Sequence, residues 1–418
     1  MHLDTHEWLE KVKIVDRFSC RPSTLAESEY WYLENGVIRH VSNRFFSMIG
    51  LKWEKEGKMC YQPFIDQSEI GTLGFIARQG DGEAELLCYA KIEPGNTGVV
   101  QIAPTCQATK SNLERVHGGA QPPYAEFFLK EKGDRISHSL QSEQGSRFFR
   151  KRNLNTVILL QDAPMNDELH RWISLRDFQH MLAVDFMVNT DARSVICCSD
   201  WQRLFSRTLF PGKGGFREAL RRSFEEPASD SLIDEIQQRI DEITATAPVA
   251  ERCAIDTMPD WEFDSRSQQT ISNSHEFILH IATHSETREV TDWDQPIFST
   301  HDSKSETLFF GRDGALLKFG FTFMCEVGLF KGVELGPSVH GPVNAKHAGS
   351  TEIIAVNQSD EGGRFFHDVT RYSIHDIGEI DPSLDLIWLT LSEIQTLLPQ
   401  GYFNNEARSV ISLILFYA

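Results

Sequence analysis

The chain contains several segments with apolar residues at every second position and fewer segments with apolar residues at helical spacing. The first spacing predicts strands with one buried face, and it occurs at 45–53 and again at 277–281. Residues 85–92 and 99–102 predict a further pair of strands, joined by a turn at Glu93-Pro-Gly-Asn96. Most elements of the predicted fold are therefore strands.

Three segments have the spacing of a helix. Residues 5–15 predict a helix near the N-terminus, and residues 231–243 place a row of Leu and Ile side chains on one helical face. Residues 172–182 predict a short helix that is capped by Ser174 and packs its apolar side on the sheet.

A repeated order of short motifs divides the chain into two similar halves. Gln141-Ser-Glu-Gln-Gly-Ser-Arg-Phe-Phe149 recurs as Gln358-Ser-Asp-Glu-Gly-Gly-Arg-Phe-Phe366. Further pairs keep the same order along the chain: Val41-Ser-Asn43 with Ile271-Ser-Asn273, Glu93-Pro-Gly95 with Glu326-Val-Gly328, Trp172-Ile-Ser-Leu175 with Trp388-Leu-Thr-Leu391, and Ala192-Arg-Ser-Val-Ile196 with Ala407-Arg-Ser-Val-Ile411. Self-similarity in an unbroken order indicates a duplicated module.

We therefore predict an α+β fold made of two tandem copies, each a mixed or antiparallel β-sheet flanked by helices. The expected parts are an N-terminal helical segment at 1–27, a first copy at 28–200, a helical connector at 201–259 and a second copy at 260–418. Within the connector, the helix at 231–243 is expected to pack across the two copies.

Composition and charge narrow the class of protein. With 40% hydrophobic and 24% charged residues, the 418-residue chain is typical of a soluble globular protein. The formal net charge of −19 argues against a general binder of nucleic acid or of anionic membranes, because the field of the whole protein repels phosphate. No apolar run approaches the ~20 residues that span a bilayer, and the N-terminus lacks the pattern of a signal peptide. Eight scattered cysteines without a CxxC pair fit a reducing compartment, so we expect a cytoplasmic protein.

The usual motifs for metals, cofactors and nucleophiles do not occur. His275-Glu-Phe-Ile-Leu-His280 has one residue too many for the histidine pair of a zinc-protease helix, and it aligns with a strand in the first copy, where Gly50 stands in place of His280. Gly212-Lys-Gly-Gly215 lacks the spacing of a phosphate-binding loop. We expect neither a metal nor a redox cofactor.

Two polar stretches of the first copy are rich in groups that bind oxygen atoms. The first is Gln101–Gly119, and the second is Gln141–Arg147 followed by Arg150-Lys-Arg152. A sugar needs many neutral donors and acceptors, and a diphosphate needs Arg or Lys. Ordinary structural roles compete with this interpretation, since Arg147 recurs as Arg364 and a salt bridge common to both copies would explain that equally well.

The same stretches carry a resemblance to a known family. The first copy resembles the sugar-nucleotide 2,3-dehydratases of deoxysugar biosynthesis in these segments: Gln62-Pro-Phe-Ile-Asp-Gln67, Glu69-Ile-Gly71, Glu93-Pro-Gly-Asn96, Val100–Asn112, Arg115-Val-His-Gly-Gly119 and Gln141-Ser-Glu-Gln-Gly145. The second copy contributes Gln358–Phe366 and Asn404-Asn-Glu-Ala-Arg-Ser-Val410. The resemblance covers nearly the whole chain.

The resemblance implies a fold and an assembly. Each copy would be similar to the Nudix hydrolase fold without its acidic metal-binding helix, and the enzyme would work as a homodimer without a cofactor. Members of the family can bind a thymidine-diphosphate ligand in both copies, with chemistry at one. This chain departs from the family pattern at Gly336–Asn344, where a longer polar segment would be expected, so we place the chemistry in the first copy.

The resemblance also implies a reaction. The expected substrate is dTDP-4-keto-6-deoxy-D-glucose, which would lose its C3 proton and then its C2 hydroxyl to give dTDP-3,4-diketo-2,6-dideoxy-D-glucose. An unstable diketone of this kind implies a 3-ketoreductase or an aminotransferase as the next enzyme of the pathway. The final deoxysugar stays open.

Residue roles follow as hypotheses. We expect His117 or Glu143 as the base and Tyr124 or Lys110 as the acid or the donor to the enolate oxygen. The expected substrate-binding residues are Gln62, Gln67, Gln101, Thr105, Gln107, Thr109, Ser111, Asn112, Arg115, Gln141, Gln144, Gly145, Arg147 and Arg152. A second nucleotide pocket is expected at Gln358, Glu361, Gly362 and Arg364. Two alternatives remain: a nucleotide-sugar-binding protein without activity, and a Nudix-type pyrophosphohydrolase, which the missing acidic segment disfavours.

Overall fold

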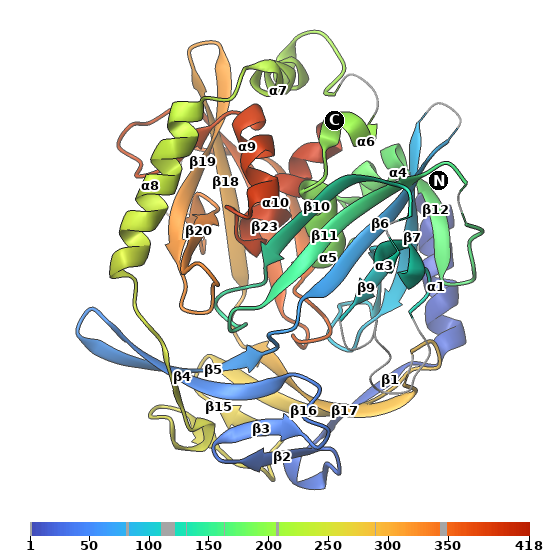
Figure 1. Ribbon diagram of the computed structural model, residues 1–418, viewed down its shortest axis with the longest axis vertical. Helices are drawn as coiled ribbons and strands as arrows, with labels where there is room; N and C mark the ends of the chain where they lie inside the picture. Colours follow the sequence, from blue (N-terminus) through green and yellow to red (C-terminus); the bar gives the residue numbers. More distant parts are fainter. Residues whose placement is uncertain are drawn as a thin grey trace.

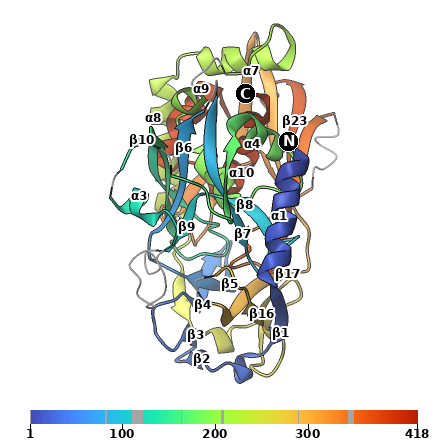
Figure 2. The ribbon, with the colours of Figure 1, turned by 90° about the vertical axis from the view of Figure 1, so that its right-hand side faces the viewer.

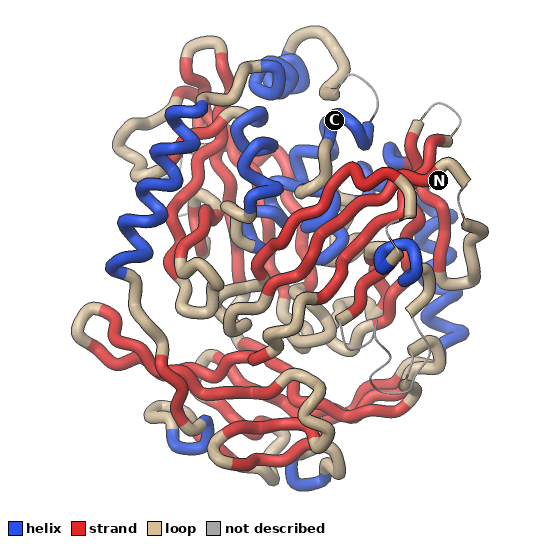
Figure 3. Tube along the Cα trace, in the orientation of Figure 1, coloured by secondary structure: helices blue, strands red, loops and turns tan. Residues whose placement is uncertain are grey.

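The computed structural model describes residues 2–80, 83–109, 122–130, 132–162, 164–205, 209–288, 290–342 and 349–418. Two large sheets with helices between them form the upper part of the molecule, and two smaller sheets form the lower part (Figure 1). The lower part of the molecule consists mostly of strands and loops, whereas most helices lie in the upper part (Figure 3). The fold is thus of the mixed α+β kind that the hydrophobic pattern predicts.

The first large sheet has the order β10-β11-β6-β7-β12, with β8 beside β7 and β9 beside β6. Only the β11–β6 pairing is parallel, so the sheet is mixed. Its strands are β6 (Gly71–Gln79), β7 (Ala84–Ile92), β8 (Val100–Ala103), β9 (Cys106–Ala108), β10 (Asp134–Ser142), β11 (Arg152–Leu160) and β12 (His170–Ser174).

The second large sheet repeats this connectivity strand for strand. Its order is β22-β23-β18-β19-β24, with β20 beside β19 and β21 beside β18, and its β18–β23 pairing is parallel. Its strands are β18 (Lys304–Asp313), β19 (Leu316–Cys325), β20 (Val333–Gly336), β21 (Val339–His340), β22 (Thr351–Ser359), β23 (Val369–Glu379) and β24 (Ile387–Leu389). The two sheets therefore share one topology.

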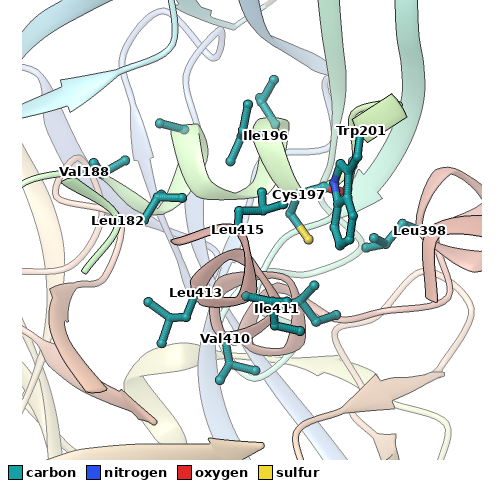
Figure 4. Close-up of a cluster of buried hydrophobic side chains, with 14 of the residues drawn as sticks. Leu182, Val188, Ile196, Cys197, Trp201, Leu398, Val410, Ile411, Leu413 and Leu415 are labelled. Carbon is teal, nitrogen blue, oxygen red and sulfur yellow. The ribbon is translucent and has the colours of Figure 1, made fainter. Parts of the chain in front are cut away.

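Two buried helices lie between the large sheets. Helix α5 (Thr190–Cys197) packs on β6 and β11, helix α10 (Asn405–Ser412) packs on β18 and β23, and the two helices contact each other. Figure 4 shows the apolar cluster around them, where Ile196 and Cys197 of α5 meet Val410 and Ile411 of α10. Burying these side chains on both faces stabilises the join of the two sheets.

The other helices cover the outside of this core. They are α1 (His2–Asp16), which runs beside β7 and β8 (Figure 2), α3 (Ala125–Leu129), α4 (Leu175–Met181), α6 (Trp201–Phe205), α7 (Gly215–Glu225), α8 (Asp230–Thr246) and α9 (Leu391–Leu397). Short 3₁₀ turns are η1 (Leu25–Glu27), η2 (Ile255–Thr257), η4 (Leu398–Gln400) and η5 (Leu413–Tyr417). No helix among the described residues is long and apolar enough to cross a membrane.

The two smaller sheets exchange strands between the halves. One contains β2 (Trp31–Glu34), β3 (Val37–His40), β4 (Ser47–Lys55), β5 (Lys58–Asp66) and, from far along the chain, β13 (Glu251–Cys253). The other contains β14 (Glu262–Phe263), β15 (Gln269–Ser272), β16 (Glu276–His284), β17 (Asp292–Thr300) and, from near the N-terminus, β1 (Ser19–Ser23). Each smaller sheet thus takes its edge strand from the segment that precedes the other sheet.

Several elements agree with the sequence prediction, and one differs in part. The strands at 45–53 and 277–281 are β4 and β16, the pair at 85–92 and 99–102 is β7 and β8, and the two long helices are α1 and α8. The helix predicted at 172–182 begins only at Leu175, because Trp172 belongs to β12 and pairs with Leu87. Ser174 caps the helix as predicted, accepting a hydrogen bond from the Asp177 backbone N–H.

Helix α8 packs mainly on one sheet, whereas the prediction was packing across the two copies. Its main contacts with other elements are with β19 and β20 of the second large sheet. Its buried side chains are Ile236 and Ile240, and Gln237 accepts a hydrogen bond from Tyr402. The helical spacing predicted the apolar face correctly, but it did not indicate which sheet covers that face.

Candidate active site

A cavity of ≈ 420 Å³ lies where the first large sheet meets the two smaller sheets. This volume is within the range of pockets that hold small ligands. Its walls come from three places: the strands β6, β7, β9 and β11 with α5; the β3–β4 region and the end of β5; and the β17 and β22–β23 segments of the second half. Both halves of the chain therefore build one cavity.

The sheet wall carries a buried ion pair. Lys91 at the end of β7 lies 2.9 Å from Glu93, and the two side chains are 6% and 5% exposed. Gln107 of β9 donates a hydrogen bond to Glu93 Oε1 at 3.3 Å, and Asn189 donates to Gln107 Oε1 at 3.0 Å. These linked contacts hold the ammonium group of Lys91 and the carboxylate group of Glu93 in place on the cavity wall.

The turn that carries Glu93 is held by a close backbone approach. Gly95 N donates to Gly362 O at 2.8 Å, and a Cβ at Gly95 would lie 1.6 Å from Phe365 O. Only glycine fits there. At the equivalent turn of the second half, a Cβ at Gly328 would lie 2.2 Å from Gly145 O. The Glu-x-Gly motif that recurs in the sequence therefore lies, in each half, at a turn whose backbone contacts the other half.

A second charged group lies at the start of β11. Lys151 donates to Glu69 O at 2.6 Å, and Asn153 Nδ2 donates to Glu143 Oε1. Asn405 of α10 donates to the other oxygen of Glu143 at 3.3 Å. Burial raises the pKa of Glu143 to about 7, and the nearby carboxyl of Glu361 adds to this shift.

The wall from the second half presents an arginine. Arg364 stacks its guanidinium 4.0 Å above the ring of Phe46 and donates from Nη2 to Gln67 Oε1 at 3.1 Å. Gly363 O accepts from Arg364 Nη1 at 2.7 Å. The buried Nε–H of this arginine has no hydrogen-bond partner among the described residues. Arg364 lines the cavity, and its guanidinium charge suits an anion such as phosphate.

The remaining wall is aromatic. The rings of Tyr30 and His40 stack with centroids 5.9 Å apart, and Phe45 meets His40 edge-on at 4.6 Å. Trp31 contacts Phe46 at 4.8 Å and donates from Nε1 to Asp294 O at 2.7 Å. Tyr30 is 50% exposed and Phe45 is 42% exposed, and both line the cavity. Such rings suit a planar base.

The corresponding place in the second half differs in two positions. Asn153 pairs with Gly71 across the parallel strands of the first sheet, and Thr370 pairs with Lys304 in the second. Lys304 therefore stands where the first half has Gly71, and its ammonium lies 3.0 Å from Asp360. Glycine leaves room for the cavity in the first half, whereas a lysine side chain fills that position in the second.

Comparisons with known proteins identify the family. The family model for NDP-hexose 2,3-dehydratase matches residues 2–199, 234–352 and 342–414. The chain belongs to this family. A curated protein from Streptomyces violaceoruber, named dTDP-4-dehydro-6-deoxy-alpha-D-glucopyranose 2,3-dehydratase, is 30% identical over 98% of this chain and 96% of its own length. Proteins of the same name from Saccharopolyspora spinosa and Amycolatopsis orientalis are 30% and 28% identical, over 89% and 98% of this chain and 82% and 89% of their own lengths.

Only some of the residues that the sequence predicted for this 2,3-dehydratase site line the cavity. Those that line the cavity are Gln67, Gln107, Thr109, Glu361 and Arg364. Two of these, Glu361 and Arg364, were assigned to a separate pocket of the second copy, but the structure places them in the cavity of the first. Lys110, Ser111, Asn112, Arg115 and His117 lie outside the described residues.

Other predicted residues make contacts away from the cavity lining. Tyr124 donates to Met165 O at 2.9 Å and meets the ring of His170 edge-on. The rest contact the following partners: Gln62 with Ser146 O, Gln101 with Ser359, Thr105 with Leu87 O and the Ile76 N–H, Gln141 with Leu398 O, the backbone of Gln144 with Arg147 and Phe148, Gly145 O with the Gly328 N–H, Arg147 with Glu276, Arg152 with Phe330, Gln358 with Ser409, and Gly362 O with the Gly95 N–H. Their part in binding the sugar nucleotide stays a prediction.

Some cavity residues of this dehydratase were missed in the sequence. Lys91 and Asn153 occupy strand positions, and a single polar residue in a strand is ordinarily assigned to its exposed face. Lys151, which belongs to the predicted basic run Arg150-Lys-Arg152, lies directly before β11. Asp191 is the second residue of α5 and directly precedes the repeated segment Ala192–Ile196, and Glu406 stands before the matching segment of the second half. That recurrence of an acid at one helical position was the signal that could have found it.

Proposed function

We propose that this NDP-hexose 2,3-dehydratase acts on dTDP-4-keto-6-deoxy-D-glucose and yields dTDP-3,4-diketo-2,6-dideoxy-D-glucose in deoxysugar biosynthesis. The observation that carries the proposal is the cavity with an aromatic end, an arginine between its walls and a cluster of buried lysines and carboxyls. The aromatic end suits the thymine base, the arginine suits the diphosphate, and the buried charged groups suit the keto sugar. The names of the relatives support the same substrate.

The orientation of the ligand follows from the walls. The partly exposed rings of Tyr30 and Phe45 would hold the thymine, and the guanidinium of Arg364 would bind the diphosphate. The hexose would then lie at the buried end, beside Lys91 and Lys151. This arrangement puts the neutral rings at the exposed end and the charged groups where water is scarce.

The chemistry needs a base for C3 and a positive group at the C4 oxygen. The C4 ketone acidifies the C3 hydrogen, and an enolate develops on the ketone oxygen when that proton leaves. Lys91 and Lys151 supply ammonium groups for this oxygen, and a preorganised donor of that kind contributes about 3–4 kcal/mol. Tyr124 and Lys110 stay the alternatives that the sequence suggests for this donor.

For the base we retain His117 and Glu143. Glu143 is buried, and its pKa of about 7 suits a group that accepts and returns protons near neutral pH. It lies behind Asn153, which lines the cavity wall and donates a hydrogen bond to it. His117 rests on the sequence alone, since it lies outside the described residues.

We further propose that each half is a Nudix-like module and that the chain arose by duplication. The shared connectivity of the two large sheets and the shared order of motifs support this. By the resemblance to its family, the enzyme works as a cytoplasmic homodimer, and a 3-ketoreductase or an aminotransferase takes its product. The second copy stays a candidate for a further nucleotide pocket.

The test is a product assay with the purified protein, dTDP-4-keto-6-deoxyglucose and EDTA. We expect a mass loss of one water and, with a 3-ketoreductase present, trapping of a 2-deoxy sugar. Unchanged substrate that still binds would contradict the proposal and favour a binding protein. Release of dTMP only after metal is restored would instead show a pyrophosphohydrolase.

A further inference from the structure

The reaction scheme above leaves one buried acidic group of the cavity without a role. Asp191 lies in the first turn of α5, is 3% exposed and lines the cavity. Within the described ranges its carboxyl group accepts no hydrogen bond, whereas Glu143 receives two from asparagines and Glu93 pairs with Lys91. A buried polar group that faces a cavity without a partner is expected to meet a ligand there.

Neighbouring charges determine what Asp191 can offer to a ligand. Burial raises its pKa well above the ordinary value, and the carboxyls of Glu143 and Glu361 raise it further, while Lys91 opposes them. Lys91 is already paired with Glu93 at 2.9 Å. Carboxyl groups that raise one another's pKa in this way resist ionising together, which favours a proton on one of them.

We propose that Asp191 is the acid of the elimination: it lies against the C2 hydroxyl of the bound sugar and protonates the departing oxygen. The inference rests on the proposed function. Asp191 is suited to this role because it lines the cavity, is 3% exposed and lies in the first turn of a helix, whereas Glu143 lies behind Asn153. Glu361 also lines the wall, but it is less buried, and the charge of Arg364 from the same turn favours its ionised form.

The step balances in atoms and charge. The base removes the C3 proton, and the electron pair of that bond moves through C4 to the ketone oxygen. When the carbonyl reforms, a C2=C3 double bond forms and the C2–O bond breaks. The leaving oxygen takes the proton of Asp191 and departs as water. The enol at O3 then returns its proton to Asp191, and the base delivers its proton to C2.

The inference predicts a dependence on the leaving group. Asp191→Asn keeps the size and neutral charge of a protonated carboxyl but cannot protonate oxygen. We expect it to lower water loss from dTDP-4-keto-6-deoxyglucose by at least ~100-fold, the usual contribution of a positioned acid. Fluoride needs no proton to depart, so the variant should release fluoride from the 2-deoxy-2-fluoro analogue within about tenfold of wild type.

Controls separate this role from a structural one. Glu406→Gln changes the acid at the matching helical position of the second half and should leave both rates within about twofold of wild type. Affinity for dTDP and the unfolding midpoint should be unchanged in Asp191→Asn. Equal losses with both substrates, or undiminished water loss, would overturn the inference alone. A wild-type protein that does not dehydrate the natural substrate would overturn the proposed function, and the inference with it.

Discussion

At the scale of single residues, the cavity depends on side chains whose partners lie in the other half of the chain. Arg364 belongs to the turn between β22 and β23, yet it stacks on Phe46 and bonds to Gln67 of the first half. The sequence identified Arg364 and Glu361 as candidate ligands through the repeat. It placed them in a second nucleotide pocket and could not show that they line one cavity with residues of the first half, because a repeat shows which residues correspond and not which surfaces they meet.

The role of Arg364 leads to a prediction about binding. Replacing it by Met removes a charged donor to the diphosphate, and such a hydrogen bond is worth about 1.5–3 kcal/mol. We expect Arg364→Met to raise KM by about 10–100-fold and the dissociation constant of dTDP equally, with a smaller change in kcat. Kinetics and calorimetric titration with dTDP measure these values.

A control variant tests whether the loss of dTDP affinity is specific to Arg364. Arg371 is a half-exposed arginine that pairs with Glu352 on the surface, so Arg371→Met removes the same charge away from the cavity. It should leave the affinity for dTDP unchanged. If both variants weakened binding to the same degree, the effect would come from the overall charge of the protein rather than from a contact of Arg364.

At the scale of elements, hydrophobic spacing predicted where the strands lie in the sequence, but it did not predict which strands pair with one another. β4, β16, β7 and β8 were predictable because each has a buried face or a marked turn. The start of α4 was not, since Trp172 and Ile173 fit a strand and a helix equally well and pairing with β7 decided the outcome. The exchange of β1 and β13 left no trace in the spacing, because strand partners are chosen in three dimensions.

The second large sheet leads to a prediction about pH. Glu334 of β20 is buried and accepts from Ser142 at 2.5 Å, and burial raises its pKa from 4.5 to about 7. Between these values the folded protein holds a proton that the unfolded chain has released. The contribution of Glu334 to the free energy of unfolding therefore falls as pH rises from about 4.5 to about 7, by up to ~1.4 kcal/mol per pH unit.

The variant Glu334→Gln tests this sign. The amide does not ionise, so the stability of the variant relative to wild type should increase between about pH 5 and about pH 8. Urea unfolding measures the difference, and Glu235→Gln on the exposed side of α8 should show no such trend. A relative stability of Glu334→Gln that is constant or decreases over this range would contradict the prediction.

At the scale of the whole molecule, the sequence revealed the two similar halves and the family, whereas their mutual packing came from the structure. The repeated Glu-x-Gly turns were visible, but their meaning lies in the contact of each turn with the opposite half. The site was predictable as polar segments rich in Gln, Thr and Arg. Its aromatic wall was not, because Tyr30 and Phe45 come from a smaller sheet that is distant in sequence from the charged end.

The measurement that tests the account most directly is a crystal structure of the enzyme with bound dTDP or a dTDP-sugar. We predict the thymine against Tyr30 and Phe45, the diphosphate at the guanidinium of Arg364, and the sugar beside Lys91 and Asp191. Such a complex would show that one cavity, built by both halves, binds the substrate. A ligand bound only at the matching place of the second half, or with its diphosphate far from Arg364, would contradict the account.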